Sequence, residues 1–253
     1  MDQAARPARV ASAPVYDRAM PAPLVMDYDH DQRRIEELID ALPRPLEVLE
    51  AGCGRLWTLN LVAPYRVTGI DLDRDALRAR FEDEGDLDEA IVGDIRTADL
   101  PAARYDVIYC SFVLEHVDGA ETVLRNFDRW LRPGGLLIVK VPDRGALYGL
   151  AARMTPHWFH VWYYRAVRKV KTAGTPGHGP YPTHYDPIIA RPGFEAFCRE
   201  RGLVLRETLL VDNYIRGSRV LRWLGRFVGI VSAGRIPWRW NDLTFIVSKP
   251  GGS

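Results

Sequence analysis

Short apolar runs alternate with amphipathic segments through the middle of the chain. Five runs rich in Val, Ile and Leu have the length of buried strands, and they lie at 46–52, 66–71, 89–94, 104–112 and 136–142. Residues 74–84 and 120–131 place apolar side chains at helical spacing, and 58–62 suggests a further helix. This alternation predicts βαβ units around a doubly wound, mostly parallel sheet of the α/β class, whose strands are buried on both faces.

The beginning of the chain departs from this pattern. Residues 1–25 are rich in Ala, Arg and Pro and lack the apolar run of a secretory signal. We therefore expect a disordered tail there, with an organelle transit peptide as the alternative. A helix capped by Asp29 or Asp31 follows, and we expect one domain over 26–250.

The pattern also changes after the fifth strand. Residues 144–190 are crowded with Tyr, Trp, His, Gly and Pro, which indicates a lid or insertion. The segments that follow are a helix at 192–201, a strand at 203–211, a long connection at 212–242 and a final strand at 244–250. A strand pair after the alternating part predicts an antiparallel hairpin at the sheet edge.

Composition narrows the function classes. The chain has 253 residues, 47% hydrophobic and 26% charged, with a net charge of +1. Such a balance suits one large globular domain and gives no overall attraction to nucleic acid. Three cysteines, Cys53, Cys110 and Cys198, lack metal-ligand spacing, and we find no compact Asp/His/Glu ligand set. We therefore expect no metal and a reducing, cytoplasmic location.

A glycine turn follows the first strand of the alternating region, in the sequence Glu50-Ala51-Gly52-Cys53-Gly54. Glycines let the backbone turn sharply and approach a ligand without interference from Cβ. In doubly wound folds, ligands bind at the carboxyl ends of the strands. The turn alone is also consistent with a simple strand-to-helix connection.

Acidic residues end the next two strands. Asp71 can accept hydrogen bonds from both hydroxyls of a ribose. Its alternative role is a helix cap, for which Asp73 is better placed. Asp94 can accept a bond from an adenine amino group while Ile95 packs on the ring, although Gly93-Asp94-Ile95 also suits a turn.

Two further motifs complete the set: YDVIYCSFVLEHV at 105–117 and WLRPGGLLIVK at 130–140. In this order the motifs resemble those of the class I S-adenosylmethionine (SAM)-dependent methyltransferases, especially the branch that acts on small molecules. The resemblance covers 46–142. It implies a mostly parallel seven-stranded sheet with an antiparallel C-terminal hairpin and SAM as cofactor. It also implies methyl transfer to an O or N atom, less often C, of a natural product, sugar or lipid-linked acceptor.

The resemblance also implies residue roles. The residues at the methionine end would be Glu50, Gly52 and Gly54; Asp71 would hold the ribose; Leu72, Asp94 and Ile95 would surround the adenine; and Ser111 and Phe112 would lie under the sulfonium. One departure is Leu56, which stands where the family commonly has a third glycine. With Arg55 and Trp57 beside it, the loop is expected to differ in shape, and Arg55 could reach a carboxylate or close the pocket.

Other functions remain open. A dinucleotide-binding enzyme would have its third glycine at position 57, where Trp57 stands. A SAM-binding scaffold that no longer methylates is the alternative from another class, and the intact Glu50, Asp71 and Asp94 argue against it. A methyltransferase acting on RNA or protein is the third.

Candidate catalytic and acceptor-binding residues follow the motif region. His116 and His184 are the candidate general bases, with structural roles as their alternatives. The acceptor candidates are His178, Tyr181, Thr183 and Tyr185, in a segment whose hydroxyls and imidazoles suit a lid over an organic molecule. Trp158, Phe159 and Trp162 suit a lid and packing against the core equally well.

The stretch 214–240 is amphipathic. On a helical wheel, an apolar side carries Val220, Leu221, Leu224, Phe227, Val228 and Val231, and the other side carries Arg219, Arg222 and Arg226. We expect the apolar side to be buried; exposure would instead indicate peripheral contact with a membrane. The sequence does not predict an oligomeric state.

Overall fold

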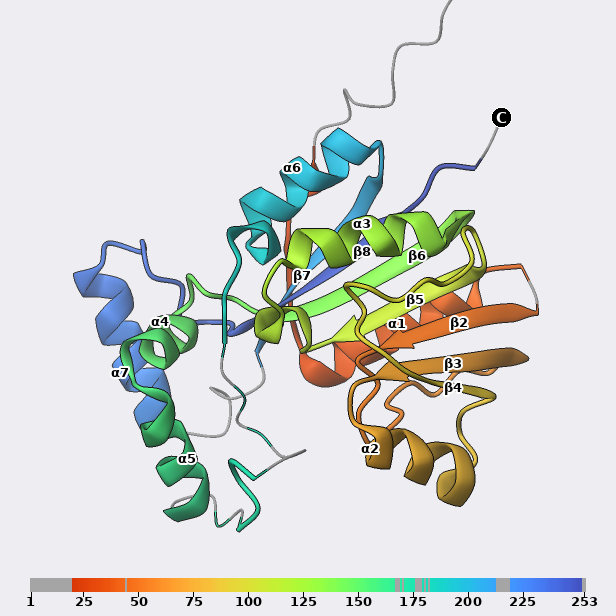
Figure 1. Ribbon diagram of the computed structural model, residues 1–253. Helices are drawn as coiled ribbons and strands as arrows, with labels where there is room; N and C mark the ends of the chain where they lie inside the picture. Colours follow the sequence, from red (N-terminus) through yellow and green to blue (C-terminus); the bar gives the residue numbers. More distant parts are fainter. Residues whose placement is uncertain are drawn as a thin grey trace, which may run out of the picture.

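The computed structural model describes residues 20–251, except 44, 167, 168, 170, 176–178, 180, 182 and 213–218. Its centre is an eight-stranded sheet with helices on both faces (Figure 1). The strands are β1 (Leu24–Asp27), β2 (Leu46–Ala51), β3 (Tyr65–Asp71), β4 (Glu89–Val92), β5 (Tyr105–Ser111), β6 (Leu131–Pro142), β7 (Val204–Asp212) and β8 (Asp242–Ser248). They are ordered β1-β7-β8-β6-β5-β2-β3-β4.

The sheet confirms the predicted class. Strands β6, β5, β2, β3 and β4 are parallel, whereas β8 runs antiparallel to both β6 and β7. The additional strand β1 pairs in parallel with β7 at the edge. This strand has only four residues, and its first two, Leu24 and Val25, are exposed. It therefore lacks the long apolar run by which a buried strand is recognised in a sequence.

Five helices pack on or beside the sheet as continuous elements: α1 (Tyr28–Asp40), α2 (Arg74–Arg78), the π-helical turn η2 (Ala79–Glu84) that extends α2, α3 (Ala120–Trp130) and α6 (Arg191–Arg201). Asp73 caps α2, as expected, by accepting from the amides of Asp75 and Ala76 at 3.0 Å. The N-cap of α1 is Asp27. The predicted caps, Asp29 and Asp31, lie inside the helix instead. Asp31 is fully buried and lies 2.6 Å from Lys140 Nζ of β6, which ties α1 to the sheet.

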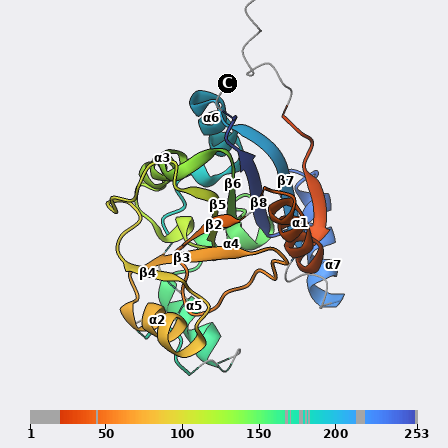
Figure 2. The same cartoon turned by 90° about the vertical axis from the view of Figure 1, so that its right-hand side faces the viewer.

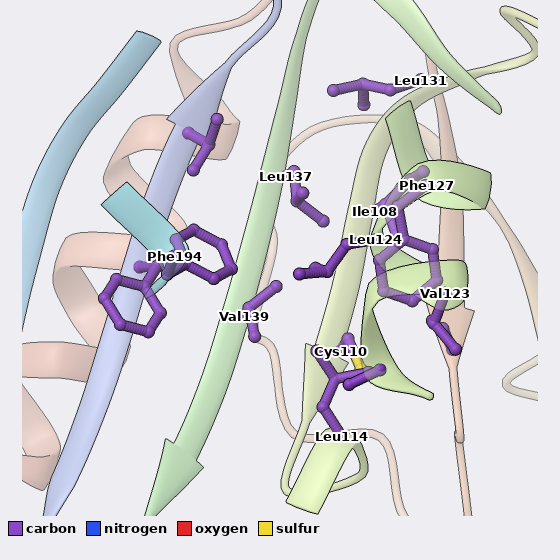
Figure 3. Packing of buried hydrophobic residues seen from close by; sticks show 14 of the residues in the cluster. Ile108, Cys110, Leu114, Val123, Leu124, Phe127, Leu131, Leu137, Val139 and Phe194 are labelled. Carbon is purple, nitrogen blue, oxygen red and sulfur yellow. The ribbon is translucent and has the colours of Figure 1, made fainter. Parts of the chain in front are cut away.

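Two apolar layers flank the sheet because successive strand residues point to opposite faces. Ile108 and Cys110 face α3, where they join Leu124 and Phe127 (Figure 3). The intervening residues of β5 belong to the cluster on the α1 side. Figure 2 shows α3 and α6 on one side of the sheet and α1 on the other.

The helix predicted at 58–62 is wrong. That segment is an irregular strand-to-strand connection lying along α1. Polar residues one helical turn apart on α1 take its backbone groups: Gln32 donates to Thr58 O at 2.6 Å, Glu36 accepts from Asn60 N at 2.8 Å, and Asp40 accepts from Val62 N at 3.3 Å. These contacts satisfy backbone groups that a helix would pair internally.

Three outer helices lie beyond the ends toward which β5 and β6 point: α4 (Leu147–Met154), α5 (His157–Ala166) and α7 (Arg219–Val231) (Figure 1). The expected burial of α7's apolar side is wrong, because Leu224 and Phe227 are exposed. The side that packs inward is instead formed by Gly225 and Gly229, against the indole of Trp238. In the part of the chain that is described, no helix is long and apolar enough to cross a membrane.

Candidate cofactor and acceptor site

A cavity of about 1100 Å³ lies at the carboxyl ends of β2, β3, β4 and β5. Strand β2 lies between β3 and β5, so the connections on its two sides run in opposite directions, which is where doubly wound sheets bind ligands. The cavity brings together most of the sequence-predicted residues: Gly52, Gly54, Asp71, Leu72, Asp94, Ile95, Ser111, Phe112, His116, Tyr181 and His184.

The glycine turn needs its two glycines for different reasons. Both have positive φ, +69° at Gly52 and +54° at Gly54. A Cβ on Gly52 would lie 2.3 Å from the side chain of Val113, so no larger residue fits without movement. A Cβ on Gly54 would meet nothing within 4 Å. Because Gly54 lines the cavity, that open side is available to a ligand.

Glu50 lies behind this turn and is not among the residues that line the cavity. Its carboxylate accepts from Arg80 Nη1 at 2.7 Å, and the same nitrogen donates to Cys53 O at 2.8 Å. Arg80 is fully buried and also bonds Asp86 at 2.9 Å. Burial raises the pKa of Glu50 to about 7, although Arg80 acts in the opposite direction.

The sequence did not predict a role for Arg80 at this site. It lies in the charged stretch 74–84, in which nothing distinguishes it from its surface neighbours. Its burial depends on the fold, which brings Glu50 and Cys53 of the turn to the same side chain. Arg80 therefore supports the turn from behind.

Asp71 bonds the glycine turn and still lines the cavity. Its Oδ2 accepts from Gly54 N and its Oδ1 from Asp73 N, both at 2.8 Å. Each carboxylate oxygen has a second acceptor position. The arrangement therefore fixes the carboxylate while leaving it able to accept bonds from a ligand's hydroxyl groups.

Asp94 is engaged by a residue that the sequence reading did not single out. Arg96 donates from Nη2 to Oδ2 at 2.6 Å and from Nε to both carboxylate oxygens, and its amide donates to Oδ1 at 2.8 Å. These bonds lower the pKa of Asp94. These three N–H groups take most of its acceptor positions, so a ligand amino group would share this carboxylate with Arg96.

The cavity lining also carries imidazoles and an aromatic ring, at His116, His184 and Tyr181. The His116 and Tyr181 rings meet edge to face, with centroids 5.6 Å apart. The amide of His184 donates to Glu115 O at 2.8 Å, which joins the segment before Pro187 to the turn after β5. The Glu115 carboxyl is buried, with Oε1 3.8 Å from His116 Nε2, and burial raises its pKa to about 8.

Two of the described acceptor candidates do not line the cavity. Thr183 and Tyr185 are absent from it, and Tyr185 O instead accepts from Arg144 Nη1 at 2.9 Å. His178 lies outside the described residues. Among the residues that are described, no group of three His, Cys, Asp or Glu could hold a metal ion.

Comparisons with known proteins agree with this geometry. A family model described as a methyltransferase domain matches residues 26–216. A probable SAM-dependent methyltransferase of Mycolicibacterium smegmatis is 38% identical over 104 residues, 39% of this chain and 38% of the relative. A malonyl-[acyl-carrier protein] O-methyltransferase of Enterobacter lignolyticus is 30% identical over 160 residues, 60% of this chain and 58% of the relative. The matches thus span less than two thirds of either relative.

Among solved structures, a SAM-dependent methyltransferase from Archaeoglobus fulgidus superposes with a TM-score of 0.52 at 16% identity. The superposition covers 87% of this chain and 94% of that one. At this identity the comparison shows a shared fold.

Proposed function

This chain belongs to the class I SAM-dependent methyltransferases, and from that membership we propose that it methylates an O or N atom of a small organic acceptor. The acceptor classes that suit the proposal are natural products, sugars and lipid-linked compounds. The observation that carries it is one continuous cavity, whose lining includes Asp71 and the glycine turn together with His116, Tyr181 and His184.

The residues present fit SAM. The open side of Gly54 accommodates the methionine end, Asp71 is placed to bind the ribose hydroxyls, and Leu72 and Ile95 offer apolar contacts to the adenine. Arg55 also lines the cavity and is half exposed, with its guanidinium 3.3 Å from Asp73. Since no helix begins directly after the turn to supply free amides, we assign Arg55 to the methionine carboxylate.

The bound sulfonium supplies an electrophilic methyl group. The chain must then align the acceptor, exclude water and remove a proton from a hydroxyl acceptor. His116 and His184 both line the cavity, and Tyr181 covers one edge of the His116 ring. We assign the general base to His116 because it lines the cavity in the turn that follows β5 and this ring contact restrains it. His184 is the second candidate.

Calorimetry and an acceptor screen test this function together. SAM and its demethylated product should bind the wild type, and Asp71→Ala should weaken binding by about 1–3 kcal/mol, the scale for losing a partner of buried polar groups. Mass spectrometry of reactions with hydroxylated and amino acceptors should find products heavier by one methyl group. Absence of SAM binding would contradict the cofactor site, whereas binding without turnover on any small acceptor would favour a scaffold or a macromolecular substrate.

A further inference from the structure

The outer helices expose an unusual amount of apolar surface. Trp158 of α5, Trp223 of α7 and Ile230 of α7 have relative exposures of 69%, 68% and 79%. The other large apolar residues exposed on these helices are Met154, Phe159, Trp162, Tyr163, Val220, Leu224, Phe227 and Val231. A concentration of this kind is typical of a surface that binds a partner or a membrane.

Helix α7 presents its apolar side to solvent, whereas an ordinary helix on the surface of a soluble protein buries that side. Its inward side is formed by Gly225 and Gly229, where an added Cβ would lie 2.6 Å and 2.8 Å from the indole of Trp238. Its outward side carries the stacked rings of Trp223 and Phe227, with centroids 6.1 Å apart. The glycines thus commit α7 to presenting its apolar side outward.

Charge is distributed as unevenly as hydrophobicity. Residues 144–185 and 213–241 together carry twelve Arg and Lys residues and no Asp or Glu. The rest of the chain holds the other 22 basic residues and all 33 acidic ones. Arg222 and Arg226 are exposed on α7 beside its apolar side, and Arg165 is exposed on α5. A binding partner that matches these helices must therefore offer both apolar and anionic groups.

We propose that the outer helices dock on an anionic lipid bilayer. Tryptophan and aliphatic side chains enter the headgroup boundary, and the arginines beside them bind anionic headgroups, as in interfacial amphipathic helices. A second copy of this chain would bring two like-charged surfaces together. Nucleic acid would match the charge but would leave aliphatic residues such as Ile230 without a partner.

The docking surface is linked to the segment that contributes His184 to the cavity. Arg144, at the start of the segment that forms α4 and α5, donates to Tyr185 O, next to cavity-lining His184. Docking would therefore hold a segment that lines the cavity close to the bilayer. A consequence that rests on the proposed function is that the acceptor is a lipid-linked molecule held in the membrane.

Vesicle sedimentation tests the docking without requiring a substrate. The full chain should co-sediment with vesicles containing phosphatidylglycerol and remain in solution with phosphatidylcholine alone, and high salt should reduce the binding. Trp223→Glu and Ile230→Glu should each weaken binding about tenfold or more, because each loses the burial of a large apolar side chain. Val62→Glu is the matched control, since Val62 is 90% exposed and lies far from the outer helices in the strand connection along α1.

The outcomes separate the candidate occupants. Thermal melting should be unchanged in all three variants because the substituted side chains are exposed. Failure of the wild type to bind anionic vesicles, or binding that Trp223→Glu and Ile230→Glu leave intact, would overturn the proposal. A second copy would be the occupant if the wild type did not bind vesicles, formed an oligomer in sedimentation equilibrium, and was monomeric after Trp223→Glu. SAM binding measured in parallel keeps a failure of docking distinct from a failure of the proposed function.

Discussion

The guanidinium of Arg80 lies 2.7 Å from Glu50, and this buried pair holds the glycine turn from the side opposite the cavity. Arg80→Met should reduce the free energy of unfolding by about 3–5 kcal/mol, because it leaves a buried carboxyl and Cys53 O without their donor. Urea denaturation measures this loss. Arg78→Met, which changes an exposed arginine in the same helix, is the control and should stay within about 0.5 kcal/mol of the wild type. Similar losses in both variants would remove the special role of Arg80.

The two glycines of the turn should respond differently to a methyl group. Gly52→Ala should destabilise the fold by about 1–3 kcal/mol, since its Cβ meets Val113 in a strained backbone. Adding Val113→Ala should recover part of that loss. Gly54→Ala should cost only about 1 kcal/mol of stability but should weaken SAM binding, because its Cβ enters the open side of the cavity. Denaturation and calorimetry on the same samples check this, and equal effects on both measures would contradict it.

The buried Glu115 should make stability depend on pH. Its pKa is about 8 in the folded protein and ordinary in the unfolded chain, so the unfolded chain binds fewer protons over the intervening range. Stability from this residue is therefore full below about pH 4.5 and is lost as pH rises to about 8. Glu115→Gln removes the effect, so its advantage over the wild type should grow by up to about 1.4 kcal/mol per pH unit. Glu121→Gln, on exposed α3 surface, corrects for loss of one negative charge. An advantage that does not change with pH would show that the carboxyl is not protonated.

Tyr181 and His184, which we propose to face the acceptor, should matter for turnover more than for cofactor binding. Tyr181→Ala and His184→Ala should each lower kcat/KM by about tenfold or more, the scale of a lost positioning or proton-transfer group. Their affinity for SAM should change less than their turnover, because Asp71 and the glycine turn, which we assign to SAM, are unchanged in both variants. Thr183→Ala is the control, as it lies between them in sequence without lining the cavity. Normal turnover in both Tyr181→Ala and His184→Ala would remove this segment from the reaction.

Much of the fold was determined by local sequence pattern. The apolar runs placed the five consecutive parallel strands β2 to β6. Four of these strands lie between two neighbours, and a strand buried on both faces needs apolar residues on both. The turn glycines and the acidic residues that follow successive strands also marked the cavity correctly, since in a parallel sheet the strand ends meet at one edge. The sequence alone therefore predicted that Gly52, Asp71 and Ser111 lie close together, and all three line the cavity.

The remaining features were decided by tertiary contacts between residues far apart in the chain. Arg80 is a site residue only because folding brings Glu50 to it, and 58–62 is not helical because Gln32, Glu36 and Asp40 of α1 bond its backbone. The apolar pattern of α7 showed that the helix has two sides but not which one faces inward. Trp238 decided that by packing against Gly225 and Gly229, and so turned the hydrophobic side of the helix toward solvent.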